Sequence, residues 1–191
     1  SHGCETMLVD FRGSGGSEGN ATTIGFHEAD DVSRAWHYAR MASPNRKIVL
    51  FGRSMGAAAI LRAISRGLVA PDGIILECPF DRLLSTIENR VRAMHVPTFP
   101  LARMLVFWGS VQQGMDGFSH NPVDYATHVE CPVLLMHGEL DSRVTMDELQ
   151  AIFAQLPGEK EFVLFPTAAH ESYLAVDPQR WKNSIVKFCD R

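Results

Sequence analysis

The sequence lacks several features that would have assigned it to other classes of protein. No apolar run approaches twenty residues, so no membrane-spanning helix is predicted. There is no Cys-x-x-Cys pair and no zinc-like cluster of cysteine and histidine, so we expect no metal and no cofactor. Basic residues form no stripe and the formal net charge is −4, which argues against nucleic acid as a partner.

The chain also has few cysteines, namely Cys4, Cys78, Cys131 and Cys189. Cys78 and Cys131 flank or sit in apolar runs that we interpret as buried strands, where a free thiol behaves as a small core residue. This usage argues against a disulfide scaffold and favours a reducing compartment. Because no signal peptide is visible, we expect a cytoplasmic protein.

Length and composition predict one globular domain over residues 1–191. The chain has 191 residues, 46% of them hydrophobic, which is enough for a sizeable core. Apolar runs alternate with helical patterns, and this alternation predicts a parallel sheet with right-handed crossovers. The expected strands cover 5–11, 47–51, 74–76, 132–136 and 161–165, and the expected helices cover 25–42, 57–64 and 178–190.

The most specific motif is Gly-x-Ser-x-Gly at Gly52–Gly56, between an apolar strand and a helix rich in alanine. Strand, sharp turn and helix form the context in which this motif is a nucleophile elbow with its serine hydroxyl exposed. Gly52 and Gly56 would let strand and helix approach closely, and the N–H of Met55 would face a developing oxyanion. The alternative is a Gly-Ser loop without chemistry, so Ser54 needs partners.

Two further polar residues follow expected strands downstream of Ser54. Asp141 lies in the loop after 132–136, and His170 lies in the loop after 161–165. Open α/β sheets keep their sites at the carboxyl ends of strands, and the order Ser, acid, His is that of α/β-hydrolases. We therefore predict Ser54, Asp141 and His170 as catalytic residues, with Glu139 and His137 as the local rivals.

The chain resembles the α/β-hydrolase-fold serine hydrolases (esterases, lipases and thioesterases) over nearly its whole length. Residues 7–19 resemble the D-x-R-G-x-G-x-S-x-G segment of that superfamily, Glu77–Phe80 resembles the end of the strand after the elbow helix, and His137–Asp141 resembles the acid loop. The resemblance implies a parallel sheet flanked by helices and an acyl-enzyme mechanism without metal or cofactor. It does not specify the substrate.

The start of the sequence departs from that superfamily. The fold normally has several strands before the Asp10 segment, together with a loop that provides a second oxyanion N–H. Here Ser1 opens the chain a few residues before the first expected strand, so the fold is expected to lack its first strands. We interpret Ser1-His2 as a cloning remnant or a cut edge, and His2-Gly3 leaves no room for the expected loop and helix.

Residues 80–128 carry no strand pattern and occupy the place where this fold inserts lids. We expect one helix over 81–95 and a second over 100–113, forming a small lid. Phe107 and Trp108 are predicted to bind substrate above Ser54, although simple packing of a helix on the sheet is the alternative. The segment is too short for a large cap domain, which indicates a modest substrate.

Three functions are consistent with these residues. The first is hydrolysis of a small carboxylic ester or thioester through Ser54. The second is a peptidase of the prolyl-oligopeptidase type, which has the same triad order but usually carries a large extra domain. The third is a non-catalytic binding protein of the same fold. Serine at the elbow argues against superfamily members whose nucleophile is aspartate or cysteine. The oligomeric state stays open.

Overall fold

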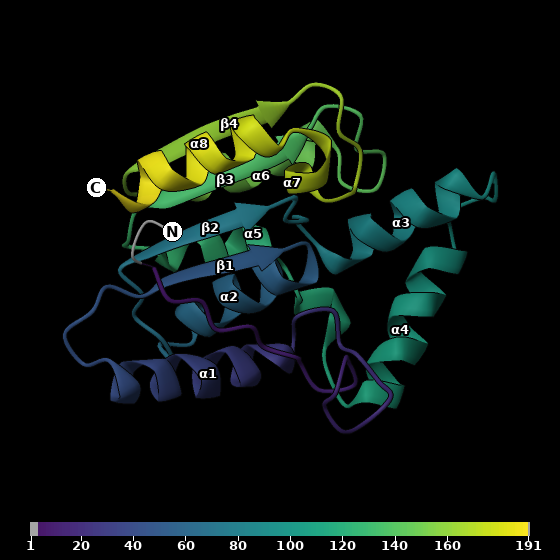
Figure 1. Cartoon of the computed structure of the whole chain (residues 1–191). Helices are drawn as coiled ribbons and strands as arrows, with labels where there is room; N and C mark the ends of the chain where they lie inside the picture. Colours follow the sequence, from purple (N-terminus) through teal and green to yellow (C-terminus); the bar gives the residue numbers. More distant parts are fainter. Residues whose placement is uncertain (1–3, 191) are drawn as a thin grey trace.

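The computed structural model describes residues 4–190, and its centre is a four-stranded parallel sheet (Figure 1). The strands β1 (Val49–Arg53), β2 (Gly73–Glu77), β3 (Val133–Gly138) and β4 (Lys160–Phe165) lie side by side in chain order. All three neighbouring pairs are parallel. The four corresponding strand predictions are thus confirmed, with β1 and β3 each ending two residues further along the chain than expected.

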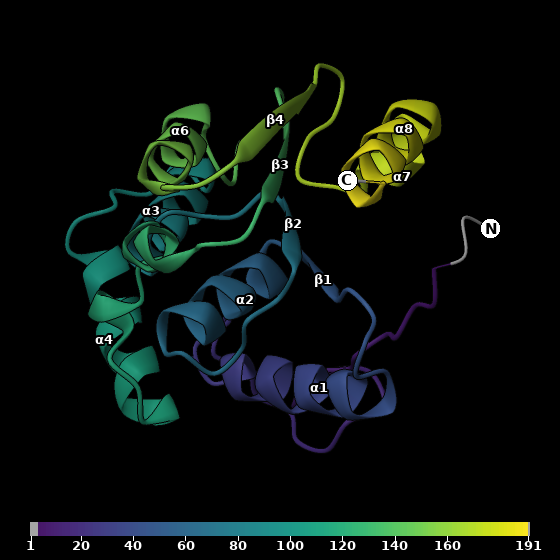
Figure 2. The same ribbon diagram turned by 90° about the vertical axis from the view of Figure 1, so that its left-hand side faces the viewer.

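Helices cover both faces of the sheet, as Figure 2 shows in a view along the strands. On one face lie α7 and α8, and on the other lie α2 and α6, with α1 beside α2. The helices are α1 Glu28–Ala42, α2 Met55–Ser65, α3 Leu83–Ala93, α4 Leu101–Gln113, α5 Pro122–Tyr125, α6 Met146–Gln155, α7 Tyr173–Val176 and α8 Pro178–Cys189, with short 3-10 turns η1 Gly117–Ser119 and η2 Ala126–His128.

Every residue of the central strands β2 and β3 is buried, and most are apolar, because both faces of these strands are covered. Successive residues of β2 alternate between two cores: Ile74 and Leu76 pack with α2 and α6, whereas Ile75 packs on the α8 side. The first core takes small alanines from α2, which allow that helix to lie close to the sheet. The arrangement confirms the expected α/β-hydrolase-like sheet flanked by helices.

The predicted strand over 5–11 is wrong, because the segment forms no strand among the described residues. The side chains of Met7, Leu8 and Val9 are exposed, and only Phe11 packs against the core. An apolar run becomes a strand only when a neighbouring strand completes its ladder of hydrogen bonds, and β1 is paired with β2 alone. Residues Ser1, His2 and Gly3, interpreted above as a remnant or cut edge, lie outside the described residues.

Two helices that position the site were not predicted individually. α6 begins at a capping box in which Thr145 and Glu148 bond each other's backbone N–H. α7 follows the His170 loop and contributes the fully buried Tyr173. α6 fixes the chain that leaves the Asp141 loop, and α7 fixes the chain that leaves the His170 loop.

Residues 80–128 carry two long helices and no strand, as expected. The helices α3 and α4 lie beyond the carboxyl end of the sheet (Figure 1) but to one side of it (Figure 2). They contact each other, and α4 also contacts η1. The two helices therefore form a projecting pair, which we call the α3–α4 arm (residues 83–113).

Candidate active site

Ser54 occupies a strained turn between β1 and α2. Its backbone has φ 50° and ψ −110°, a conformation that a residue with a side chain rarely adopts. The Ser54 N–H donates to the carbonyl of Glu77 at 2.8 Å, which ties the turn to β2. A strained backbone of this kind is what the predicted nucleophile elbow requires.

The two glycines of the motif have different roles. A Cβ on Gly52 would lie 2.6 Å from the carbonyl carbon and oxygen of Gly56, so only glycine lets β1 and α2 approach this closely. A Cβ on Gly56 would meet nothing nearer than Phe11 at 3.9 Å, an ordinary contact. The prediction that both glycines are required for close approach is therefore wrong for Gly56.

The Asp141 and His170 loops are interlocked. The N–H groups of Glu139 and Leu140 donate to the carbonyls of Phe165 and Ala168, each at 3.0 Å. A Cβ on Gly138 would lie 2.4 Å from the carbonyl oxygen of Ala168, so this crossing also requires glycine. These contacts fix the spacing between the Asp141 loop and the His170 loop.

Side chains from these three loops meet in one hydrogen-bonded row. The His170 imidazole lies 3.1 Å from Ser54 Oγ through Nε2 and 2.7 Å from Asp141 Oδ2 through Nδ1. The Asp141 carboxylate is fully buried and the His170 side chain is 16% exposed. Asp141 accepts at Oδ2, so the hydrogen lies on His170 Nδ1 and Nε2 is left to accept from the serine hydroxyl.

The other oxygen of Asp141 is also held. Its Oδ1 accepts from the N–H groups of Arg143 at 2.8 Å and Val144 at 3.0 Å. Burial opposes ionisation of this carboxyl, but the bonds from His170 and from the two N–H groups outweigh it, so the pKa of Asp141 is lowered. Near neutral pH the group is therefore a fixed anion beside the imidazole. No pattern in the sequence indicates these two backbone donors.

The rivals named from the sequence lie elsewhere. His137 is buried on β3, and burial lowers the pKa of its imidazole, so it is a neutral group behind the site. Glu139 is exposed in the same loop. His120 is fully buried under the long connection, with Nε2–H donating to the carbonyl of Ile24 at 2.9 Å. Neither rival, nor His120, is hydrogen-bonded to Ser54 in the part of the chain described here.

Met55, the predicted oxyanion donor, is the first residue of α2. Amides in the first turn of a helix have no intrahelical acceptor and carry the positive end of the helix dipole. The N–H of Met55 is therefore chemically suited to an anion beside Ser54. Its side chain is contacted by Thr22, whose Oγ1 lies 3.1 Å from the Met55 sulfur.

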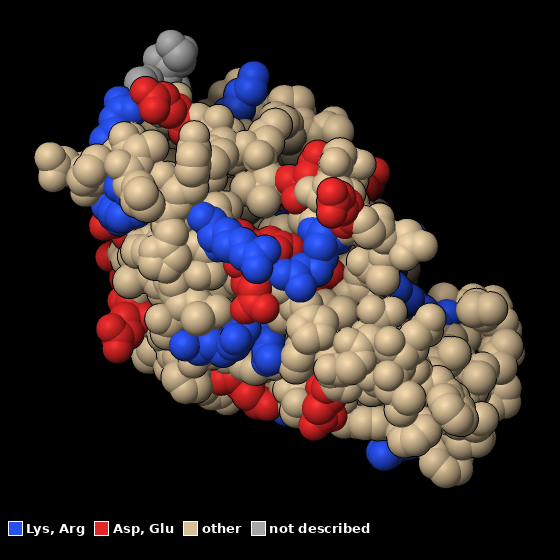
Figure 3. All heavy atoms as spheres, turned by 90° about the horizontal axis from the view of Figure 1, so that it is seen from below, with Lys and Arg blue, Asp and Glu red and all other residues tan. Residues whose placement is uncertain are grey.

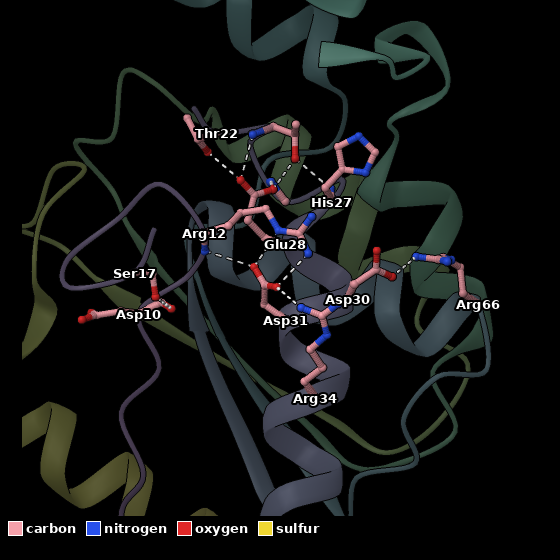
Figure 4. A network of polar contacts seen from close by, with 12 residues as sticks. Asp10, Arg12, Ser17, Thr22, His27, Glu28, Asp30, Asp31, Arg34 and Arg66 are labelled. Carbon is pink, nitrogen blue, oxygen red and sulfur yellow. Dashed lines mark hydrogen bonds and ion pairs between the residues drawn. The ribbon is translucent and has the colours of Figure 1, made fainter. Parts of the chain in front are cut away.

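A buried carboxylate, which the sequence did not reveal, holds the loop beside Met55. Glu28 accepts from Thr22 Oγ1 and Thr23 N at 2.8 Å each, from Thr23 Oγ1 at 2.5 Å and from Gly25 N at 2.9 Å (Figure 4). Burial disfavours its charge, but these bonds outweigh burial and lower the pKa of Glu28. The loop is thus fixed against α2, where Gly25 comes close to Met55 and Ala59.

The preceding loop is anchored by a separate ion pair. Arg12, from the Asp-x-Arg-Gly segment, forms a two-pronged contact with Asp31 of α1, at 2.7 Å and 2.9 Å (Figure 4). This pairing lowers the pKa of Asp31. The motif that supports the resemblance therefore acts structurally in this chain, because it ties residues 12–23 to the first helix.

One potential metal-ligand set overlaps the same residues. Ligand atoms of Cys78, Asp141 and His170 lie within 4.8 Å of one another. Burial, reinforced by the charge of Asp141, raises the pKa of the Cys78 thiol to about 12. A protonated thiol is a poor ligand, and both other groups already bond each other, so the set does not fit a resident metal ion.

The predicted substrate contacts lie on the arm. Phe107 and Trp108 are 51% and 63% exposed, and their rings contact each other edge to face with centroids 5.3 Å apart. Since the arm stands to one side of the sheet, a roof above Ser54 is not evident (Figures 1 and 2). Their role in binding substrate stays a prediction.

The sequence is similar to one protein family and to several individual proteins. A family profile described as serine aminopeptidase, S33, matches residues 1–124. The uncharacterised protein YqkD of Bacillus subtilis is 24% identical over 191 residues, covering 98% of this chain and 63% of that protein. Lysophosphatidylserine lipase ABHD12 of Danio rerio is 26% identical over 184 residues, covering 88% of this chain and 45% of the lipase.

A solved structure gives the same fold. The Pyrococcus furiosus esterase Pf2001 superimposes with a TM-score of 0.75 at 23% identity, over 95% of this chain and 68% of the esterase. The chain spans about three fifths of the length of the first bacterial relatives it matches. Every helix in the described part of the chain falls short of the length and apolarity that a membrane span requires.

Proposed function

The chain belongs to the family described as serine aminopeptidase, S33, within the α/β-hydrolase-fold serine hydrolases, and we propose that it cleaves a carboxylic ester or thioester through an acyl-enzyme on Ser54. The observation that carries the proposal is the row of hydrogen bonds from Ser54 through His170 to Asp141. Each residue comes from a different strand end, so the row is a product of the whole sheet.

In this mechanism His170 is the general base. Its Nε2 takes the hydroxyl proton as Ser54 Oγ attacks the carbonyl carbon, and it then returns the proton to the leaving alcohol or thiol. Asp141 orients the ring and stabilises the imidazolium. Water, deprotonated by the same nitrogen, then releases the acyl group from Ser54.

The N–H of Met55 stabilises the oxyanion in this proposal. Its place at the start of α2 directs a donor and the helix dipole toward the carbonyl oxygen. A preorganised donor of this kind is worth roughly 3 kcal/mol to the transition state. No metal or cofactor takes part.

An ester is favoured as substrate by two comparisons. One relative is named a lysophosphatidylserine lipase and one structural neighbour an esterase. We propose a small-molecule acyl substrate on this basis. No disulfide links the cysteines of residues 4–190, which favours a reducing, cytoplasmic setting. The family description favours a second candidate, a peptidase with the same triad.

The deciding experiment labels the chain with a fluorophosphonate and compares it with Ser54→Ala. We expect labelling of the wild type and of the control Ser119→Ala, whose serine is exposed on η1, and none of Ser54→Ala. Turnover of p-nitrophenyl esters, thioesters and aminoacyl amides then separates esterase from peptidase. A wild type that neither labels nor turns over any of these substrates would favour the non-catalytic binding protein.

A further inference from the structure

The side of helix α4 that packs against the rest of the protein carries small side chains, whereas its solvent-exposed side carries large apolar ones. Ala102 and Val106 are 1% and 4% exposed, and Val106 lies beside Gly117 of η1, whose N–H donates to Ser110 Oγ. The opposite side is exposed and apolar. We call this side the α4 outer face, defined by Leu101, Met104, Leu105, Phe107, Trp108 and Val111.

The apolar surface continues into the connection from α3. Met94, Val96 and Phe99 are exposed there, and Met94 and Phe99 exceed 70%. An ordinary helix of this kind turns its large apolar residues toward the core. A contiguous exposed patch of this size marks an interaction site rather than scattered surface residues.

The charged residues within the stretch that carries this patch, residues 89–115, all have one sign. Residues 89–115 contain Arg90, Arg92 and Arg103 but no aspartate or glutamate. The chain carries 22 acidic residues among 191, so a stretch of this length would ordinarily hold about three. The three arginines are exposed, and none of them forms an ion pair within residues 4–190. Figure 3 shows the broad uncharged area at the end of the molecule that carries the arm.

We propose that the α4 outer face docks on the surface of an anionic phospholipid bilayer. A helix with Trp, Phe and Leu on one side and arginine at the flank lies in the membrane interface, with its apolar side in the acyl boundary. Trp108 suits that depth because its ring is apolar and its N–H is polar. Arg103 on α4, with Arg90 and Arg92 on α3, faces the lipid phosphates.

The charge pattern disfavours a second copy of the chain as the occupant. An isologous dimer through this face would bring two sets of arginines together, and residues 89–115 offer no carboxylate to pair with them. An anionic bilayer supplies both the apolar layer and the missing negative charge. Because the whole chain has a net charge of −4, adsorption to anionic vesicles requires a local cause such as this face.

The test is co-sedimentation of the purified chain with vesicles of phosphatidylglycerol and phosphatidylcholine, and with vesicles of phosphatidylcholine alone. We expect stronger binding to the anionic vesicles, weakened by salt. Trp108→Gln and Met104→Gln should each lower the partition coefficient about tenfold. Met41→Gln removes a methionine of α1 that is even more exposed than Met104, 82% against 51%, and should leave the partition coefficient unchanged.

Two charge-reversal variants complete the experiment. Arg103→Glu should weaken binding to anionic vesicles more than tenfold. One arginine near such a surface raises the partition coefficient about fivefold, and charge reversal both removes this attraction and adds a repulsion of similar size. Arg34→Glu on α1 makes the same change in net charge and serves as the control. Circular dichroism shows whether each variant is folded.

Three outcomes would overturn the proposal. They are absence of binding to any vesicle, equal binding by Trp108→Gln and wild type, and a dimer that Trp108→Gln dissociates while vesicle binding is absent. Quenching of Trp108 by brominated lipid in a Trp36→Phe/Trp181→Phe background supports the proposal directly, and lack of quenching in sedimenting protein contradicts it. All these readouts are independent of hydrolytic activity.

Discussion

Acid destabilisation through His120 is the most direct quantitative test of this structure. The His120 side chain is fully buried, with Nε2–H bonded to the carbonyl of Ile24 and Nδ1 facing the Tyr125 hydroxyl at 3.3 Å. Burial, and secondarily the nearby charge of Arg62, lower the pKa of His120 from 6.5 to about 4. The bond to Ile24 and the charge of Glu28 oppose this shift without cancelling it.

The sign of the effect follows from proton binding. Between pH 6.5 and 4 the unfolded chain binds a proton at His120 that the folded chain does not, so stability falls as pH falls. The difference between these two pKa values corresponds to about 3 kcal/mol in full, and to about 2 kcal/mol between pH 7 and 5. His137 adds to the loss with the same sign, because burial lowers its pKa as well.

The assay is urea unfolding of wild type and His120→Gln at pH 5, 6 and 7. Glutamine can still donate to the carbonyl of Ile24 but does not titrate. Between pH 7 and 5 the free energy of unfolding of the variant should therefore fall by about 2 kcal/mol less than that of wild type. His95→Gln, which removes an exposed imidazole, reports the effect of the exchange itself. Parallel pH curves for wild type and His120→Gln would refute the reasoning, whatever the absolute stabilities.

The remaining predictions concern the site. Asp141→Asn should lower kcat by roughly three to four powers of ten in ester hydrolysis with little change in KM, because the imidazole loses its orienting anion; a loss below tenfold would contradict its role. Gly52→Ala should destabilise the chain by about 3 kcal/mol in urea unfolding, because its Cβ meets the backbone of Gly56 at 2.6 Å, whereas Gly56→Ala should cost less than half as much. Phe107→Ala and Trp108→Ala should reduce kcat/KM more for long acyl esters than for acetate if these rings bind the acyl chain, and an equal loss at every chain length would exclude that contact.

The sequence predicted the four strands of the sheet because their apolar runs are short, continuous and separated by turns. It also predicted that Ser54, Asp141 and His170 would lie near one another, since parallel strands end at one edge. It failed at residues 5–11, where the same apolar signal lacks a neighbouring strand. Strand propensity is a property of one segment, whereas the hydrogen-bonded ladder of a sheet requires two adjacent strands.

Other features could not be predicted for a different physical reason. The four bonds that Glu28 accepts depend on a turn at Thr22–Gly25 whose shape no periodicity indicates. The two N–H donors behind Asp141 belong to backbone, which carries no residue signature. The orientation of α4 is also invisible in its sequence, because apolar residues occur on both of its sides.

The interlocked loops at the end of β3 and β4 have a consequence for folding kinetics. Ser54 and His170 are 116 positions apart in the chain, and their hydrogen bond needs every strand of the sheet in register. Contacts of such high sequence separation form late, after the loops between them have closed. A refolding or nascent chain should therefore gain its secondary structure well before it can be labelled at Ser54. The rate at which labelling at Ser54 appears during refolding would then report the rate at which the last strand docks.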